Sequence, residues 1–138
     1  MKGQGLREIL TSVRSIALIG ASRNPERPSH RVMAFLINQG YDVYPVNPGL
    51  SGSELLGRKV YASLSDIPAP IDMIDIFRQP DAVGPLVEAA IAQGVKVVWT
   101  QLGVINTAAA EVAERAGLKV VMDRCPAIEI PRLGLLKT

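Results

Sequence analysis

The sequence predicts an α/β fold in which a doubly wound parallel sheet lies between two layers of helices, as one three-layer domain over residues 1–138. Short apolar runs of strand length alternate with longer segments whose apolar residues recur every three to four positions. Runs such as 16–19 and 97–99 contain no polar residue, which is typical of parallel strands covered on both faces. With 138 residues, 48% of them hydrophobic, the chain has apolar material for one core.

The helices and strands are expected in regular alternation along the chain. Leu6, Ile9, Leu10 and Val13 recur at helical spacing and predict an amphipathic helix at the start. The following elements, in order, are a strand at 16–19, an apolar helix around 32–37 that Gly40 closes, a strand at 41–46, a short strand at 59–61, a strand at 71–77, a helix from about residue 82 to Gly94, a strand at 95–99, a helix over 106–116 capped by Asn106, and a last strand at 118–122.

Three strand residues carry additional predictions. Pro45 cannot donate a backbone hydrogen bond, so its strand is expected at an edge of the sheet, or to end or bulge there. Asp72 and Asp75 are three positions apart in one strand and therefore face opposite sides of the sheet, which argues against a paired carboxylate site. We expect Asp75, on a buried strand, to be hydrogen-bonded within the structure.

The composition excludes several classes of function. A net charge of +2 argues against a general nucleic-acid or membrane-binding field. A single cysteine, Cys125, excludes an internal disulfide and a multi-cysteine zinc site, and the single histidine, His30, leaves little for a metal site or a conventional catalytic triad. Since no stretch has the length of a signal peptide core or a membrane span, we expect a cytoplasmic protein.

The segment after the first strand has the features of a phosphate-binding corner. Gly20 allows a sharp turn because a residue without Cβ adopts positive φ readily. Arg23, Arg27 and Arg31 follow it, and Ser29 is expected as the N-cap of a helix whose free N–H groups favour an anion. Charge and geometry together predict a phosphorylated ligand.

This corner departs from the dinucleotide fingerprint G-x-G-x-x-G. Ser22 and Pro25 stand where the second and third glycines belong, and Asn47, after the next strand, stands where an acid would bind the ribose of NAD. Plain NAD is therefore disfavoured. Coenzyme A and NADP both carry an additional ribose phosphate that arginines would bind, so the charge pattern alone leaves both open.

Five motifs follow the predicted strands and should meet at one edge of the sheet. They are Gly20-Ala21-Ser22-Arg23-Asn24-Pro25, Pro45-Val46-Asn47-Pro48, Asp75-Ile76-Phe77-Arg78, Trp99-Thr100-Gln101-Leu102-Gly103 and Asp123-Arg124-Cys125-Pro126. In this order, over about residues 16–133, the chain resembles the stand-alone coenzyme A-binding proteins, Rossmann-like domains similar to the N-terminal domain of the succinyl-CoA synthetase α subunit.

The resemblance implies that coenzyme A is the cofactor, with its phosphates on the glycine corner and its arginines. Cys125 would lie near the thiol end of the ligand. The cofactor-binding residues expected are Gly20, Ala21, Ser22, Arg23, Pro25, Arg27, Arg31, Val46, Asn47, Phe77, Arg78, Pro80, Gln101 and Cys125.

The function expected is non-catalytic binding of coenzyme A or acyl-CoA, as a carrier, sensor or regulator, without a metal or a catalytic residue. The synthetase domain that bears a phosphorylated histidine has no counterpart in this length, so ligase activity is not carried over. One alternative is an NADP-linked oxidoreductase or other nucleotide-binding enzyme with a degenerate fingerprint, although no Tyr-x-x-x-Lys pair is present. Another is the coenzyme A-binding subunit of a larger acyl-CoA ligase complex.

Overall fold

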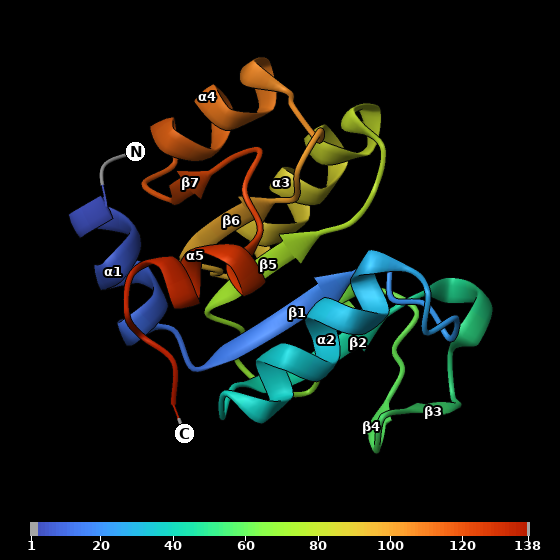
Figure 1. The fold of residues 1–138 in the computed structure, drawn as a ribbon. Helices are drawn as coiled ribbons and strands as arrows, with labels where there is room; N and C mark the ends of the chain where they lie inside the picture. The colour runs from blue at the N-terminus through green and yellow to red at the C-terminus, as the bar shows by residue number, and fades with distance from the viewer. Residues whose placement is uncertain (1–2, 138) are drawn as a thin grey trace.

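The computed structural model describes residues 3–137 and has a five-stranded parallel sheet at its centre (Figure 1). The strand order is β2-β1-β5-β6-β7, and every neighbouring pair runs parallel. The strands are β1 (Ser15–Ile19), β2 (Asp42–Val46), β5 (Met73–Ile76), β6 (Val97–Thr100) and β7 (Lys119–Val121). This confirms the predicted Rossmann-like fold.

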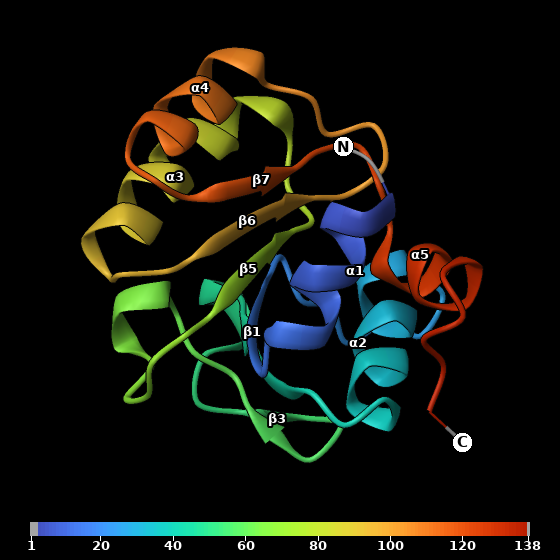
Figure 2. The ribbon, with the colours of Figure 1, turned by 90° about the vertical axis from the view of Figure 1, so that its left-hand side faces the viewer.

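Helices cover both faces of the sheet (Figure 2). One face carries α1 (Gly3–Ser12), α2 (Pro28–Asn38) and α5 (Pro126–Arg132), and the other carries α3 (Val83–Ala92) and α4 (Thr107–Arg115). Alternation along the strands divides the core in two: Leu18 and Trp99 pack with the first group of helices, whereas Ala17 and Val98 pack with the second. The predicted α1 is confirmed, but α5 was not expected.

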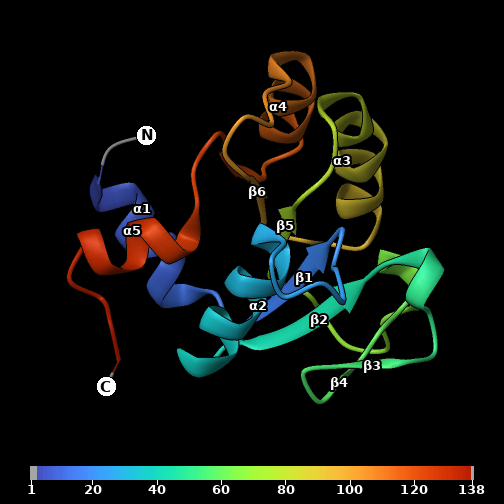
Figure 3. The same ribbon diagram turned by 45° about the vertical axis from the view of Figure 1, so that its right-hand side comes forward.

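The segment between β2 and β5 folds away from the main sheet as a small hairpin, at the lower right in Figure 3. It contains two single 3₁₀ turns, Pro48–Leu50 and Leu64–Asp66, on either side of β3 (Glu54–Leu55) and β4 (Arg58–Lys59). The strand expected at 59–61 is therefore only partly present, since Tyr61 makes a single bridge to Val46.

The strand order places a switch point between β1 and β5. From β1 the chain continues to β2 on one side, then returns past β1 to form β5 on its other side. In open parallel sheets, ligands bind beyond the carboxyl ends of the strands at such a point. A ligand site is therefore expected at the residues that follow β1 and β5.

Asp72 connects neighbouring strands at the end of the sheet where the strands begin, opposite their carboxyl ends. Its Oδ2 accepts hydrogen bonds from the backbone N–H groups of Arg14 and Ser15 at 2.8 and 3.2 Å. The Oγ atom of Ser15 accepts from the N–H of Asp72 at 2.9 Å, and Lys96 forms an ion pair with Asp72 at 3.9 Å. These contacts join the starts of β1, β5 and β6.

Two expectations about single residues are wrong. Ser29 is not an N-cap, because α2 begins at Pro28 with Arg27 in the capping position, and Ser29 lies buried in the first turn. Proline suits the first helical position, since its fixed φ is already helical and it has no N–H to satisfy. Asp75 is fully buried, yet neither of its carboxylate oxygens has a hydrogen-bond partner within residues 3–137.

The expectations for Pro45 and Asn106 are confirmed. Pro45 lies in β2, the edge strand, and the Asn106 side chain accepts a hydrogen bond from the N–H of Ala109 at 3.0 Å. Within residues 3–137, no helix has the length and apolar character needed to span a membrane.

Candidate functional site

The turn after β1 brings three strand ends together. Gly20 has φ +95° and donates its N–H to the carbonyl of Val46 at 3.0 Å, so the turn is fastened to the end of β2. A Cβ atom at Gly20 would overlap the carbonyl oxygen of Phe77, just beyond the end of β5. Glycine is therefore required by the backbone conformation and by the close approach of the neighbouring chain.

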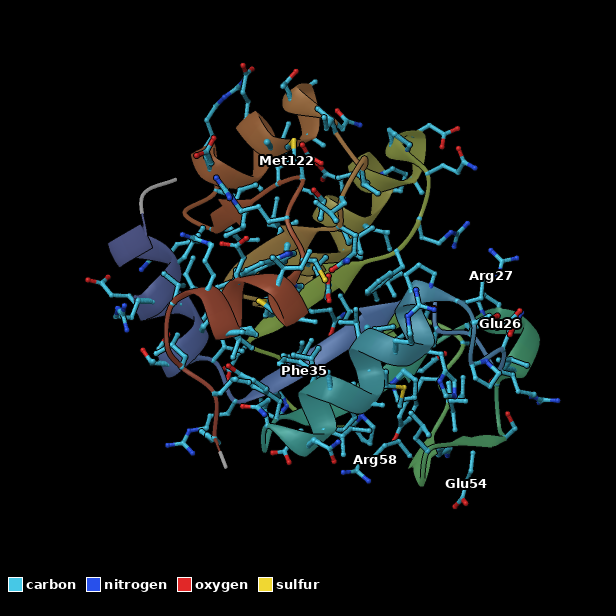
Figure 4. The ribbon with its side chains drawn as sticks, in the orientation of Figure 1. Glu26, Arg27, Phe35, Glu54, Arg58 and Met122 are labelled. Carbon is cyan, nitrogen blue, oxygen red and sulfur yellow. The ribbon has the colours of Figure 1, made fainter. Side chains whose placement is uncertain are left out.

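The loop over residues 22–27 is shaped by its own side chains. Ser22 Oγ accepts from the N–H of Asn24 at 3.1 Å, and Asn24 Oδ1 accepts from the N–H of Glu26 at 3.0 Å. Arg31, on the first turn of α2, donates from Nη1 to the carbonyl of Glu26 at 2.7 Å. Figure 4 shows Glu26 and Arg27 on this loop, at the start of α2. These hydrogen bonds fix the loop conformation, and one nitrogen of the Arg31 guanidinium is used to hold the loop.

The arginines around this loop lack acidic partners. Among residues 3–137, no carboxylate forms an ion pair with Arg23, Arg27, Arg31 or Arg78. All four side chains are exposed and line the same cavity, beside the N-terminus of α2. Unpaired guanidinium groups and the free N–H groups of a helix N-terminus both favour an anion, and guanidinium groups bind phosphate oxygens in bidentate fashion.

Asn47 connects the ends of β1 and β2. Its Nδ2 donates to the carbonyl of Ala21 at 2.8 Å, and its Oδ1 accepts from the N–H of Gly49 at 2.8 Å. The side chain lines the cavity, but both polar atoms already have backbone partners. Asn47 therefore supports the shape of the site through the backbone.

The turns after β6 and β7 form the other end of the site. Asp123, with φ +61°, accepts from the N–H of Gly103 at 2.7 Å, and Trp99 Nε1 donates to the carbonyl of Arg124 at 2.8 Å. These bonds hold Gln101 and Cys125 on neighbouring segments, and both residues are buried and line the cavity. Trp99 itself belongs to the core, whereas Phe77 lies half-buried against the cavity.

A single cavity of about 1540 Å³ runs along this edge of the sheet. It is larger than the usual 300–1,000 Å³ of small-molecule pockets, which suits a long ligand. Every cofactor-binding residue predicted from the sequence lines it except Pro25 and Pro80. Pro80 borders a smaller hollow beside it, and neither Pro25 nor His30 contributes to either wall.

Sequence reasoning missed the apolar wall of the cavity. The residues concerned lie on the helices, on the segment between β2 and β5 and on the loop after β6, and include Val32, Phe35, Leu50, Leu64, Leu86, Val104 and Ala127. Phe35 is labelled on α2 in Figure 4. Helical spacing identifies such residues as inward-facing, but it does not tell a cavity wall from a packed core. Within residues 3–137, no group of three His, Cys, Asp or Glu side chains is placed to hold a metal ion.

Comparison with known proteins identifies several relatives. The family model described as "CoA binding domain" matches residues 14–131. The uncharacterized protein YneT of Bacillus subtilis (strain 168) is 35% identical over 120 residues, which cover 87% of each chain. A hypothetical protein from Pyrococcus horikoshii OT3 has a solved structure with a TM-score of 0.92 and 47% identity, over 96% of this chain and 92% of that one.

The chain also resembles part of longer enzymes. It is 39% identical over 95 residues to the alpha subunit of acetate–CoA ligase (ADP-forming) I of Pyrococcus furiosus. The matching segment covers 66% of this chain but only 21% of that subunit. The match over residues 14–131 includes all five motifs that line the carboxyl edge of the sheet. The chain belongs to the CoA-binding domain family.

Proposed function

We propose that this protein binds coenzyme A or an acyl-CoA at the cavity along the carboxyl edge of its sheet, and does so without catalysis. The observation that carries the proposal is the set of exposed arginines that form no ion pair within residues 3–137, beside the N-terminus of α2 at one part of a long cavity with an apolar wall. Coenzyme A matches this arrangement, since it joins a pyrophosphate and a ribose phosphate to an extended pantetheine arm. Membership of the CoA-binding domain family supports the same ligand.

The side chains around the cavity support binding without a catalytic step. Nucleophilic catalysis by Cys125 requires a neighbouring base. The only histidine of the chain, His30, does not line the cavity. A role as carrier, sensor or regulator in the cytoplasm is consistent with binding alone. Incubation with acetate, ATP and coenzyme A is expected to give no acetyl-CoA by chromatography, and turnover by the purified chain would refute this part of the proposal.

Titration calorimetry with coenzyme A, dephospho-CoA, NAD and NADP tests the ligand. We expect coenzyme A to bind more tightly than NAD, because no acid follows β2 to bind a free ribose while arginines are available for the ribose phosphate. Dephospho-CoA should bind more weakly than coenzyme A for the same reason. NAD or NADP binding as tightly as coenzyme A would contradict the proposal.

The Arg27→Ala variant should lower the affinity for coenzyme A by about tenfold or more, since a charge-assisted hydrogen bond contributes roughly 1.5–3 kcal/mol. Its stability should hardly change, because Arg27 is exposed and unpaired. Arg31→Ala should lower the affinity and also loosen the loop, because Arg31 holds the carbonyl of Glu26.

The control is Arg115→Ala, which removes the same charge from α4, outside the cavity lining. Its affinity for coenzyme A, measured by the same calorimetry, should match that of the parent. If both Arg27→Ala and Arg31→Ala bind as the parent does, the phosphates lie elsewhere.

A second candidate function is that of a coenzyme A-binding subunit in a larger ligase assembly. It is favoured by the likeness to a segment of the acetate–CoA ligase alpha subunit. Size-exclusion chromatography of the tagged protein from its own cells separates the candidates, since a subunit would elute with a larger partner.

A further inference from the structure

Asp75 is an acid without a partner in the interior of the protein. Its side chain is 0% exposed, and neither carboxylate oxygen makes a hydrogen bond. The Oε1 atom of Gln101 is also buried and unpartnered, and these three oxygens are the only such side-chain atoms in residues 3–137. Buried polar atoms nearly always have partners, so three unpaired acceptors on two residues require an explanation.

The two side chains lie on the same side of the sheet. Asp75 on β5 stands opposite Trp99 on β6. The ladder continues past the end of β6, because the N–H of Gln101 donates to the carbonyl of Ile76 at 3.2 Å. Gln101 is thus two positions beyond Trp99 and faces the same way. Standard sheet spacings put the Cα atoms of Asp75 and Gln101 about 8 Å apart, which the two side chains together can bridge.

A proton on Asp75 would pair these atoms. Acceptors cannot bond to one another, but a neutral carboxylic acid has one O–H donor. Burial raises the pKa of Asp75 well above its usual value, because the surroundings disfavour the charged form. The neutral acid can therefore donate to a buried acceptor on its face of the sheet, and Gln101 Oε1 is the buried side-chain oxygen there that has no partner among residues 3–137.

We propose that Asp75 is a positioning residue for the coenzyme A site, whose O–H group donates to Gln101 Oε1 and turns the amide N–H₂ of Gln101 toward the cavity. Gln101 lines the cavity, and of its two amide atoms only Oε1, and not Nε2, is both buried and without a partner among residues 3–137. The amide then offers a donor to a carbonyl oxygen, and the pantetheine arm of coenzyme A carries two amide carbonyls. This inference rests on the proposed function for its ligand but not for the contact between the two residues.

A double-mutant cycle tests the contact through coenzyme A affinity. Asp75→Leu keeps the size and apolar fit but removes the donor, and should weaken binding roughly two- to tenfold, the value of one net hydrogen bond. Asp75→Asn keeps an N–H donor and should bind as the parent does. In a Gln101→Leu background, neither substitution at Asp75 should change the affinity further. A merely structural role predicts no rescue by Asn and no coupling to Gln101.

A measurement without ligand separates failure of this inference from failure of the proposed function. The infrared spectrum of the unliganded protein should contain the band of a neutral carboxylic acid at neutral pH, and Asp75→Asn should remove it. The side-chain amide signal of Gln101 in ¹⁵N NMR should shift in Asp75→Leu and stay near its parent position in Asp75→Asn.

The outcomes decide between the two claims. A parent protein that keeps the infrared band but does not bind coenzyme A would refute the function and leave the contact standing. Absence of the band, or Asp75→Leu binding as tightly as the parent while Gln101→Leu binds weakly, would overturn the positioning role. If Asp75→Leu fails to fold, the infrared band and its loss in Asp75→Asn still decide.

Discussion

Gly20→Ala is expected to destabilise the protein more than any other single methyl addition in the site. The new Cβ would overlap the carbonyl oxygen of Phe77, and the residue would have to keep φ near +95°. Backbone strain of this kind costs about 1–3 kcal/mol and overpacking about the same again, so the free energy of unfolding should fall by roughly 2–6 kcal/mol. Urea denaturation followed by Trp99 fluorescence measures the loss.

Gly94→Ala is the matched control for Gly20→Ala. Gly94 also has positive φ, +75°, but a Cβ there would meet no described atom within 4 Å. It should lose only the part of the stability that comes from backbone strain. Equal losses at Gly20 and Gly94 would show that the contact with Phe77 relaxes freely. Any Gly20→Ala protein that folds should bind coenzyme A poorly, since the ends of β1 and β5 would be forced apart.

The second large effect concerns pH. Burial raises the pKa of Asp75 in the folded protein well above the value of 3.8 expected for an exposed aspartate. Between those two pKa values the folded state binds one more proton than the unfolded state, so stability falls as pH rises, by up to about 1.4 kcal/mol per pH unit. Asp75→Asn removes this term and should be increasingly more stable than the parent at higher pH. Urea denaturation of both proteins at pH 5 and pH 8 measures the difference.

Asp42→Asn is the control for the pH experiment, because Asp42 is exposed at the start of β2. It should follow the pH dependence of the parent. If Asp75→Asn shows the parental pH dependence too, Asp75 is ionised in the folded protein, and the proton inferred between Asp75 and Gln101 is absent.

The sequence predicted the sheet and its helices because periodicity reports burial directly. Ile16 and Leu18 alternate with Ala17 and Ile19, and all four are buried because helices cover both faces of β1. The helix α5 was not predicted because it is short, begins at Pro126 and contains a second proline, Pro131. Too few apolar residues recur at helical spacing in it to give a clear pattern. Short helices of this kind depend on packing that local sequence does not encode.

The site was predictable where its chemistry is unusual and not where it resembles a core. Gly20 and the arginines that follow it stand out in the sequence because a packed apolar core seldom contains such residues in a row. Leu64 and Leu86 line the cavity, but they also belong to the apolar layer around α3, so their spacing alone does not reveal them. The prediction for Asp75 was wrong because sequence shows that a residue is buried without showing whether a donor lies near its carboxylate, and none does among residues 3–137.

The hydrogen bonds that Asp72 accepts at the start of the strands have an evolutionary consequence. Its bonds to Arg14 and Ser15 set the register at the edge where the strands begin, a full strand length from the cavity. Loops at the cavity edge can therefore lengthen, shorten or change partner without disturbing the alignment of the strands. Such a domain can form most of a chain or be joined to further domains, in keeping with matches that cover 87% of YneT but 21% of a ligase alpha subunit.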